Sequence, residues 1–505
     1  MSRGKVDLWM DLLGGQNSQH IDRLRQDQKL VEMSQASNVI PDPVGKLVTS
    51  PGFSKVRATA ISGAPAITGM FHLGDRTDEF LLTSSDGEIN RDNANPPAAL
   101  AGGTDFTSGA SVLTRFAMGG SSASGAEIVA IVSSSRDVPQ AVTVSTMGKA
   151  NLAGTPPRGV DVKVFGRRPW MFGPSDGTDV YRSLACFGST DDSMTAWTNP
   201  FTTNFLNFGR PGQQMNVLGG EIYKDFLMTF TEDQVFPVYQ TPAATLPFSF
   251  QAPIFSEEGG GPPVIHSVVP ANDRIYWISK NFDVKMLEGG VVKSIGYAIQ
   301  PFLRGLKDSA RGQCVGGWEP QYRMVIWSVT DGSDTQNNDA VMLQVDTGQF
   351  YFRTISRNAY AIRRVSGELR LIGGGYAGLF YNEFDSSTTG DLDNSASAID
   401  ADVMTPRHHL GMPHVTKKVP YFCAEFDPIS TEAITVQYQI NDDQSWTSFP
   451  ESPYTVVGTD VDPAYFTIPQ PFERIRLRFR DANSGQRFRV LRYGFPSPRA
   501  LKVSR

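Results

Sequence analysis

Cysteine is scarce in this chain. Three cysteines occur among 505 residues, and Cys186, Cys314 and Cys423 lie far apart in the sequence. An odd number of widely spaced cysteines, with no Cys-x-x-Cys pair, excludes a disulfide framework and a zinc knuckle as the basis of the fold. We therefore expect three free thiols, buried as free cysteines usually are.

The chain also has few charged residues and lacks long apolar runs. Charged residues make up 19% of the chain, which is below the usual quarter, and the net charge is −6. Lysine and arginine form no cluster, which argues against electrostatic binding of nucleic acid. The composition is still compatible with a mildly acidic channel wall along which DNA slides. The sequence shows neither a secretory signal nor a run of 18 apolar residues, so we expect a soluble protein made in a cytoplasm.

Recognisable catalytic and metal-binding motifs are missing. The sequence has no Gly-x-Ser-x-Gly elbow, no phosphate-binding Gly-Lys-Ser/Thr loop and no His-Glu-x-x-His. Three of the six histidines, His408, His409 and His414, crowd together. Neighbouring residues of an extended segment point to opposite sides, so an ordinary linker is favoured over a metal site.

The carboxylates that stand out in the sequence lie at turns. Turn geometry alone explains aspartate at such positions. Glycoside hydrolysis requires two carboxylates about 5–10 Å apart across a sugar, and a sequence does not display that separation. We therefore predict no catalytic, cofactor-binding or metal-binding residue and no enzymatic activity. The carboxylates concerned are Asp86, Asp191, Asp192, Asp233 and Asp283.

Glycine and proline, by contrast, are plentiful, with 48 and 33 residues. This composition is typical of many short strands joined by tight turns. A chain of this length also exceeds a single small core, so two or more domains are expected.

Residues 46–412 repeat a unit of strand, turn, strand and loop, with an irregular spacing of roughly 40 to 50 residues. In one clear example, the apolar residues 274–278 are followed by a turn at 281–283 and a second strand at 284–287. We count about six or seven such units, each a small antiparallel sheet that buries its faces by radial stacking. The pattern predicts an all-β protein built on a six- or seven-bladed β-propeller, although a pair of packed β-sandwiches would give similar local signals.

Residues 413–505 differ in character. The segments 435–440 and 475–480 alternate apolar and polar residues, as half-buried strands do, and predict a C-terminal β-sandwich. Arg476, Arg478 and Arg480 share one face of the second segment. This stripe could meet phosphate or an acidic partner, but a solvated face or pairing with carboxylates on the same chain is favoured.

Residues 1–45 form an N-terminal arm ahead of the β-rich body. Part of the arm could be helical with one apolar stripe, because Ile21, Leu24, Leu30, Val31 and Met33 are set among polar residues. The arm is too small to fold alone. It either straps onto its own body or contacts a neighbouring subunit, and in the second case we expect its removal to leave a folded body but weaken assembly.

The order of short motifs in this leader resembles the start of the tail hub, or nozzle, proteins of short-tailed bacteriophages, also called packaged-DNA stabilisation proteins. That family has Gly-Gly-x-Asn, a polar run with a glutamine, Asn-Val, Pro-x-Gly and Arg-Pro-Gly-Phe before its first blade. Ser50 stands here where the family has the arginine. Residues 166–172 are similar to the family's basic-then-aromatic segment, and the C-terminal section is similar as well. The matching leader residues are Gly14-Gly15-Gln16-Asn17, Gln28, Asn38-Val39, Pro43-Val44-Gly45 and Pro51-Gly52-Phe53.

The resemblance implies a structural virion protein with a mechanical function. Such a protein forms a ring, commonly a homohexamer, below the portal and adaptor proteins of the viral tail. The ring extends or closes the DNA exit channel, retains packaged DNA until ejection, and anchors spikes or fibres. Genome DNA then passes without sequence-specific binding, and neither a cofactor nor a membrane span is implied.

Two other classes of function stay open. One is a different virion structural protein, such as a fibre base or a head-completion factor. The other is a glycan-binding or glycan-cleaving β-propeller in which Trp170, Trp277 and Trp327 line a sugar site. These tryptophans lie inside apolar strand runs, which favours core packing over sugar contact.

Overall fold

The computed structural model describes most of the chain, and its regular structure is β, as the sequence predicts. The longest helices among the described residues are α1 (Gln300–Gly305) and the 3-10 helix η4 (Asp308–Gln313), which have six residues each. No helix in this part of the chain has the length and apolar character needed to cross a membrane. The described residues are 8–10, 22–23, 33, 35–41, 46–74, 78–120, 128–134, 136–198, 200–209, 215–243, 246–332, 334–365, 367–385, 399–412, 414–427, 432–456, 463–481, 489–496 and 499–500.

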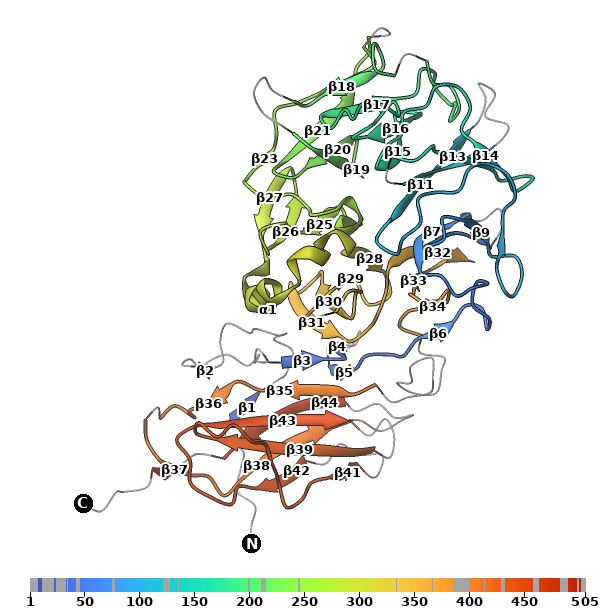
Figure 1. Cartoon of the computed structure of the whole chain (residues 1–505). Coiled ribbons are helices and arrows are strands. Elements are labelled where there is room, and N and C mark those ends of the chain that lie inside the picture. The colour runs from blue at the N-terminus through green and yellow to red at the C-terminus, as the bar shows by residue number, and fades with distance from the viewer. Residues whose placement is uncertain are drawn as a thin grey trace.

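The larger of two bodies, called the upper body here, consists of seven antiparallel sheets of four or five strands in the described residues, one of which continues into the smaller body (Figure 1). Sheets 1 to 3 are β7 (Ile67–His72), β8 (Phe80–Ser84), β9 (Ile89–Arg91) and β10 (Ala98–Ala99); β11 (Thr114–Gly120), β12 (Ile128–Ser134), β13 (Gln140–Thr143) and β14 (Gly148–Asn151); and β15 (Asp161–Phe165), β16 (Arg168–Phe172), β17 (Leu184–Phe187) and β18 (Phe205–Asn207).

Sheets 4 to 7 follow the same plan. They are β19 (Val217–Tyr223), β20 (Phe226–Thr231), β21 (Gln234–Gln240) and β22 (Phe248–Phe250), with β23 (Phe255–Ser256) also on β21; β24 (Val269–Ala271), β25 (Arg274–Ile278), β26 (Val284–Glu288) and β27 (Val291–Ser294); β28 (Val315–Glu319), β29 (Met324–Val329), β30 (Asp339–Gln344) and β31 (Gln349–Arg353); and β32 (Ala359–Val365), β33 (Glu368–Gly374), β34 (Phe380–Asn382) and β6 (Ser54–Lys55).

The first strands of the seven sheets contact one another in a closed circle, from β7 through β11, β15, β19, β24, β28 and β32 back to β7. Sheet 7 takes its fourth strand from the other end of the segment, because β6 pairs with β34 through Tyr381 and Asn382. The sheets therefore resemble β-propeller blades, as the sequence predicts.

Local sequence explains both the hairpins and the packing between sheets. Asn272 and Asp273 adopt positive φ angles of 47° and 55°, as the two-residue turn between β24 and β25 requires. Apolar residues on facing sheets then fill the space between them. Phe230 of sheet 4 meets Trp277 of sheet 5 edge to face, with ring centroids 5.4 Å apart.

The lower body consists of two sheets packed across a single apolar core. Phe422 and Phe479 come from opposite sheets, and their ring centroids are 6.4 Å apart. One sheet runs β4 (Val39–Pro41), β5 (Leu47–Thr49), β44 (Arg489–Phe495), β38 (Tyr421–Phe426), β42 (Pro463–Thr467), with β1 (Leu8–Met10) also on β44; the other contains β2 (Asp22–Arg23), β36 (Arg407–His408), β43 (Ile475–Asp481), β35 (Ala401–Met404) and β3 (Gln35–Ser37), with β39 (Glu432–Ile440) on β43, and β40 (Thr447–Ser448) and β41 (Tyr454–Val456) on β39. A further pair, β37 (Lys417–Lys418) and β45 (Arg499–Ala500), completes the set.

Strand pairing differs from the segment boundary predicted at residues 412/413. The strands β35 and β36 precede that boundary, yet both hydrogen-bond to β43 of the C-terminal section. The sequence could not indicate this, because the partners are separated by about 70 to 80 residues and pair through backbone groups.

The described part of the predicted arm lies on its own chain. Strands β1, β3 and β4 join the sheets of the lower body, and Met10, Met33, Ala36, Val39 and Ile40 are buried in its core. The described leader residues include strands but no helix. The remaining residues of the expected apolar stripe, Ile21, Leu24, Leu30 and Val31, lie outside the described residues.

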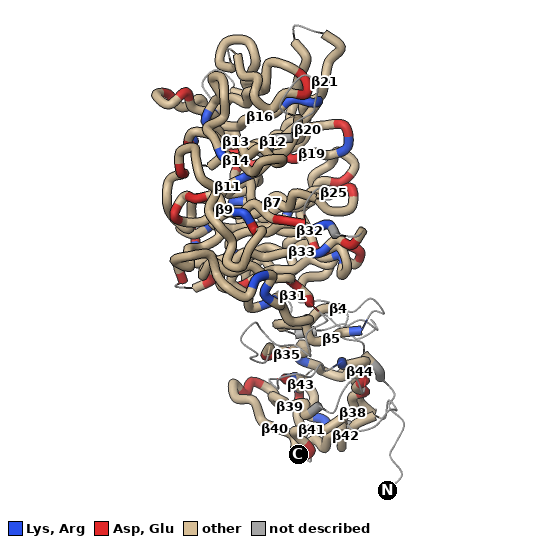
Figure 2. Tube along the Cα trace, turned by 90° about the vertical axis from the view of Figure 1, so that its right-hand side faces the viewer, with Lys and Arg blue, Asp and Glu red and all other residues tan. Residues whose placement is uncertain are grey.

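Strand β3 joins the two bodies. It pairs antiparallel with β35 of the lower body and parallel with β31 of sheet 6, so one hydrogen-bonded sheet runs through both. Figures 1 and 2 show β4 and β5 between β31 and β35, at the level of this junction.

Candidate functional site: the axial chamber and the junction of the two bodies

A chamber of about 380 Å³ lies where the first strands of the seven sheets meet. Part of its wall is aromatic: the rings of Phe71 and Phe116 stack with centroids 5.7 Å apart. This volume falls in the range of small-ligand pockets, and a nucleic-acid duplex does not fit within it.

Charged side chains in the chamber wall form a balanced network. Arg115 Nε lies 3.0 Å from Asp161 Oδ1, and Lys163 Nζ lies 2.6 Å from Glu221 Oε2. A longer contact of 3.6 Å joins Arg115 Nη2 to Glu221. The buried Asp161 also accepts the N–H of Gly220 at 2.9 Å. Two cations thus match two carboxylates, and the network ties sheets 2, 3 and 4 together.

His266 closes one side of the chamber. Its Nε2 donates to the carbonyl of Thr114 at 3.1 Å, which connects the segment before sheet 5 to the start of sheet 2 across the ring. Burial and the nearby charge of Arg115 lower the pKa of His266 to about 3, so its ring is neutral at physiological pH. The arrangement favours a rigid axis over an acid–base group.

Asn38 is the central polar residue of the junction between the bodies. Its φ of 56° places it in the left-handed region that asparagine tolerates. Its Nδ2 donates to the carbonyl of Asp400 at 2.8 Å, and its Oδ1 accepts the N–H of Thr354 at 2.9 Å. Its backbone carbonyl accepts the N–H of Ser50 at 2.8 Å. One residue thus bonds the leader, the end of sheet 6 and the lower body.

A buried ion cluster lies beside Asn38. Glu383 is fully buried and pairs with both Arg353, at 3.3 Å, and Arg357. The ring of Phe53 lies 4.5 Å from the guanidinium carbon of Arg357 and 5.7 Å from that of Arg353. Arg353 also donates to the carbonyl of Pro51 at 3.1 Å. The segment 51–53 is therefore held by cation–π contact and hydrogen bonding to sheets 6 and 7.

Glu319 is a second buried carboxyl near this cluster. Its oxygens accept the N–H groups of Gln321 at 2.9 Å and Leu371 at 3.3 Å. Burial raises the pKa of Glu319 to about 7, against the lowering effect of these two hydrogen bonds. Its protonation therefore changes near neutral pH.

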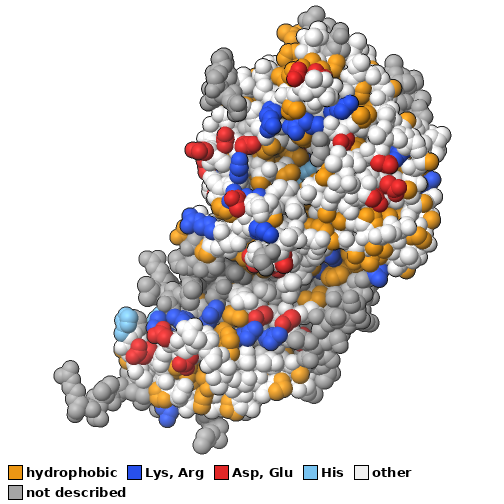
Figure 3. All heavy atoms as spheres, viewed as in Figure 1, with side chains coloured by type: hydrophobic (Ala, Val, Ile, Leu, Met, Phe, Trp, Pro, Cys, Tyr) orange, Lys and Arg blue, Asp and Glu red, His pale blue; other side chains and the backbone are white. Residues whose placement is uncertain are grey.

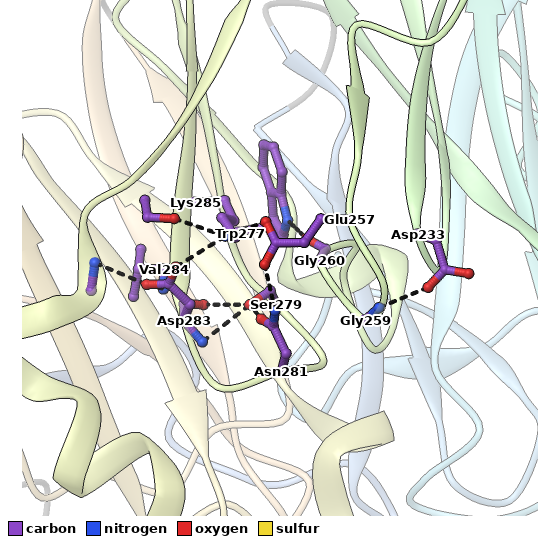
Figure 4. A network of polar contacts seen from close by, with 12 residues as sticks. Asp233, Glu257, Gly259, Gly260, Trp277, Ser279, Asn281, Asp283, Val284 and Lys285 are labelled. Carbon is purple, nitrogen blue, oxygen red and sulfur yellow. Dashed lines mark hydrogen bonds and ion pairs between the residues drawn. The ribbon is translucent and has the colours of Figure 1, made fainter.

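Another polar network locks sheet 4 to sheet 5 (Figure 4). Glu257 accepts from Asn281 Nδ2 at 2.7 Å and pairs with the buried Lys285 at 2.8 Å. Trp277 Nε1 donates to the carbonyl of Gly260 at 2.9 Å, and Asp233 accepts the N–H of Gly259 at 2.8 Å. These side chains hold the segment that connects the two sheets.

The arginine stripe of β43 pairs with carboxylates of the same chain, which confirms the favoured interpretation. Arg478 makes two bonds to Asp402, at 2.8 and 2.7 Å, and Arg480 Nε lies 2.8 Å from Asp400. Arg476 donates to a backbone carbonyl just after β35 at 3.0 Å. The stripe therefore fastens β35 to β43.

The histidines that are close in sequence do not converge. His408 is buried, with its Nε2 2.9 Å from the hydroxyl of Tyr493, whereas His414 is exposed. Within the described ranges, no group of three or more His, Cys, Asp or Glu side chains could hold a metal ion.

The turn carboxylates make local or neighbouring contacts. Asp86 accepts the N–H of Glu88 at 3.2 Å. Asp191 pairs with Arg168 at 2.6 Å, and Asp192 pairs with Arg167. Turn and hairpin geometry accounts for these carboxylates, as the sequence suggests.

The tryptophans and cysteines named from the sequence are buried in the described core. The indole nitrogens of Trp170, Trp277 and Trp327 donate to backbone carbonyls at 3.2, 2.9 and 2.8 Å, so these rings pack between sheets as expected. The predicted free, buried thiols are confirmed for all three cysteines.

Sequence reasoning missed the residues that matter most at both sites. Asp161 and Glu221 are charged residues in strands that are mostly apolar, and such a position predicts a buried partner. Glu383 likewise lies in a mostly apolar and aromatic stretch, after Phe380-Tyr381-Asn382 and before Phe384. Their partners, however, lie about 26 to 60 residues away, and nothing in the sequence links them.

Comparison with known proteins gives structural likeness only. No protein-family model and no curated protein matches the sequence. The structure is similar to BamB from Moraxella catarrhalis, with a TM-score of 0.37 and 12% identity over 74% of this chain and 98% of that one. It is also similar to an ancestral GH74 enzyme, with a TM-score of 0.42 and 12% identity over 71% of this chain and 51% of that one.

Proposed function

We propose that this chain is a structural protein of a bacteriophage virion, a tail hub or nozzle subunit. In this proposal copies of the chain form a ring, commonly a hexamer, below the portal and adaptor proteins of the tail. The ring extends or closes the DNA exit channel, retains the packaged genome and anchors spikes or fibres. The role is mechanical and requires neither an active site nor a cofactor.

The position of the leader motifs is the observation that carries the proposal. Asn38-Val39 and Pro51-Gly52-Phe53, two of the motifs behind the family resemblance, lie at the junction of the two bodies. A leader that holds two bodies together for a mechanical function is expected to have its motifs at the junction of those bodies. The other motifs, at 14–17, 28 and 43–45, lie outside the described residues.

The proposal includes the finer architecture. The seven sheets constitute one seven-bladed β-propeller closed by β6, and the two sheets of the lower body constitute a β-sandwich with the leader built into it. The hydrogen-bonded connection through β3 supports a rigid subunit. A subunit that transmits force along a tail needs such rigidity.

Genome DNA would pass between subunits rather than through a propeller. The axial chamber measures about 380 Å³, and the hydrogen-bonded residues His266 and Thr114 are among those that line it. A net charge of −6 fits a wall that DNA slides past. The face drawn in Figure 3 has basic and acidic side chains interspersed, without a basic stripe along the whole molecule.

Electron microscopy tests the proposal directly. The purified chain would be imaged alone and after mixing with tailed particles that lack it, with the particles alone as the control. We expect rings with closed cyclic symmetry, or restored density at the tail vertex. A protein that stays monomeric and never joins particles would overturn the proposal.

Each alternative function predicts a different result with the same purified protein. A fibre base or head-completion factor would restore density at another position on the particle. A glycan-directed propeller would release sugar from host polysaccharide or bind glycans. The burial of Trp170, Trp277 and Trp327 removes the aromatic surface suggested for that role from the sequence.

A further inference from the structure

The axial chamber has a polar wall on one side and an aromatic wall on the other. Sheets 2, 3 and 4 bring Arg115, Lys163 and Glu221 to its lining, whereas sheets 6 and 7 bring Trp318 and Tyr360. Sheet 3 lies opposite sheets 6 and 7 in the closed circle of seven first strands, so the two walls face each other. A space with such walls suits a molecule that has one polar end and one apolar end.

The side chains of both walls are only partly buried. Those of Arg115, Lys163 and Glu221 keep 20%, 19% and 10% of their surface exposed. Trp318 and Tyr360 are half-buried as well. Because all of these residues line the chamber, an occupant can contact them without displacing a strand.

The polar wall has hydrogen-bonding capacity that the described part of the chain does not use. Lys163 Nζ has three N–H donors, and its partner there is Glu221 at 2.6 Å. Arg115 Nη2 lies 3.6 Å from Glu221, which is too far for a hydrogen bond, and is buried without a hydrogen-bond partner among the described residues. His266 Nδ1 is buried in the same state. Since Nε2 of the neutral ring donates to Thr114, this Nδ1 is an acceptor.

The charge of the polar wall sets a condition on any occupant. Its two cations are balanced by the carboxylates of Asp161 and Glu221. An occupant with a net charge would therefore carry that charge uncompensated into the protein, which costs free energy. A zwitterion avoids this cost, because it supplies one acceptor group and one donor group with no net charge.

We propose that the axial chamber binds a zwitterionic amino acid with a large aromatic side chain. Its carboxylate accepts hydrogen bonds from Arg115 and Lys163, and its ammonium group donates to Glu221 and to Nδ1 of His266. Its ring packs on the aromatic wall. A chamber of about 380 Å³ has room for this ligand, since a cavity of about 150 Å³ already holds benzene. The site does not depend on the ring assembly proposed above.

A set of small probes separates the parts of this ligand. L-phenylalanine has all of them, hydrocinnamate lacks the ammonium group, phenethylamine lacks the carboxylate, and glycine lacks the ring. Binding of each probe to the full chain would be measured by isothermal titration calorimetry at neutral pH. The series uses the unmodified protein, so its result does not depend on whether a variant folds.

We expect L-phenylalanine to bind and each of the two charged fragments to bind about 10- to 100-fold more weakly. Each fragment loses a charge-assisted hydrogen bond and brings an unbalanced charge. Glycine should bind weakly as well, because it buries no apolar surface. The proposal is overturned if L-phenylalanine does not bind, if either charged fragment binds as tightly as L-phenylalanine does, or if glycine does.

Lys163→Met tests whether binding takes place in the chamber. The variant leaves one excess carboxylate in the polar wall, so L-phenylalanine should bind about tenfold more weakly. Phenethylamine, a cation, should by contrast bind more tightly than it does to the unmodified chain. A purely structural role of Lys163 would weaken both ligands in parallel, and that result would count against the proposal.

Lys293→Met is the matched control. Lys293 is exposed on the outer strand of sheet 5 and pairs with Glu288 at 2.8 Å, so the substitution breaks a similar ion pair away from the chamber. Both affinities should stay as they are in the unmodified chain. If Lys293→Met changes them as Lys163→Met does, the ligands bind elsewhere and the chamber is not their site.

Discussion

The backbone N–H of Asn38 donates to the carbonyl of Phe352 at 2.7 Å, and this bond continues the hydrogen bonding of sheet 6 into the lower body. The side chain of Asn38 adds bonds to both sides of the same junction. A connection through paired strands resists bending far more than a flexible linker does. The two bodies are therefore expected to move and unfold as one unit.

Replacing Asn38 with alanine should destabilise this junction. The variant Asn38→Ala loses the hydrogen bonds to Asp400 and Thr354. It also holds alanine at a positive φ, where no side-chain bond offsets the backbone strain. The two effects together should lower the free energy of unfolding by about 2–4 kcal/mol. Denaturant unfolding followed by fluorescence, together with calorimetry, would measure the loss. We also expect the single transition to separate into two.

Asn38→Gly is the matched control for backbone strain, because glycine adopts φ of 56° without penalty. Glycine still lacks the side-chain bonds, so the difference between the two variants isolates the strain. If both variants unfold as the unmodified chain does, Asn38 does not couple the bodies.

Glu383 should be the most sensitive position of the buried ion cluster. Glu383→Gln leaves Arg353 and Arg357 without a counter-charge in a fully buried site, and the loss should be about 3–5 kcal/mol. Equilibrium unfolding checks this value. The control is Glu368→Gln, an exposed residue paired with Arg370, for which we expect almost no change. Equal effects at the two positions would contradict the assignment.

The sequence predicted the individual sheets of the upper body better than the strand pairing that completes sheet 7. Turn residues such as Asn272 and Asp273, and apolar runs on either side of them, indicate hairpins because these signals are local. The pairing of β6 with β34 joins residues more than 300 positions apart through backbone atoms alone. No side-chain pattern records that pairing.

The candidate sites were less predictable for the same reason. The arginine stripe of β43 was visible as an alternation, but its partners Asp400 and Asp402 lie about 80 residues earlier on a strand that reads as part of the preceding repeat. Asn38 stood out through the family resemblance, not through a physical signal. Its role follows from its φ and four hydrogen bonds, which only the folded chain displays.

Removal of residues 1–45 should now be expected to destabilise the lower body. The described part of this segment contributes β1, β3 and β4 and places Met10, Met33, Ala36, Val39 and Ile40 in the core. Loss of buried side chains of this size costs about 2–5 kcal/mol each for the larger ones. The sequence alone led us to expect a folded body after this deletion.

Limited proteolysis and calorimetry of the truncated chain would check this expectation. We expect early cleavage in residues 399–496 and a preserved transition for the upper body. Removal of residues 1–7 alone is the control, since it leaves all the described strands in place. A truncated chain with the melting profile of the full chain would show that the leader is dispensable for folding.

The pKa of Glu319 predicts a pH dependence of stability with a definite sign. Burial raises this pKa from its ordinary value of 4.5 to about 7, so the folded chain binds the proton more tightly than the unfolded chain does. The stabilisation is fully present below about pH 4.5 and is lost as the pH rises through 7. A difference of this size corresponds to roughly 3 kcal/mol at most.

Glu319→Gln should remove that dependence, because glutamine stays neutral at every pH. The variant also loses one acceptor for the N–H groups of Gln321 and Leu371, which lowers stability by an amount that does not vary with pH. Unfolding free energies measured from pH 5 to pH 8 should therefore fall more steeply for the unmodified chain than for Glu319→Gln. Parallel curves for the two proteins would mean that Glu319 keeps one protonation state across this range, in conflict with its burial between sheets 6 and 7.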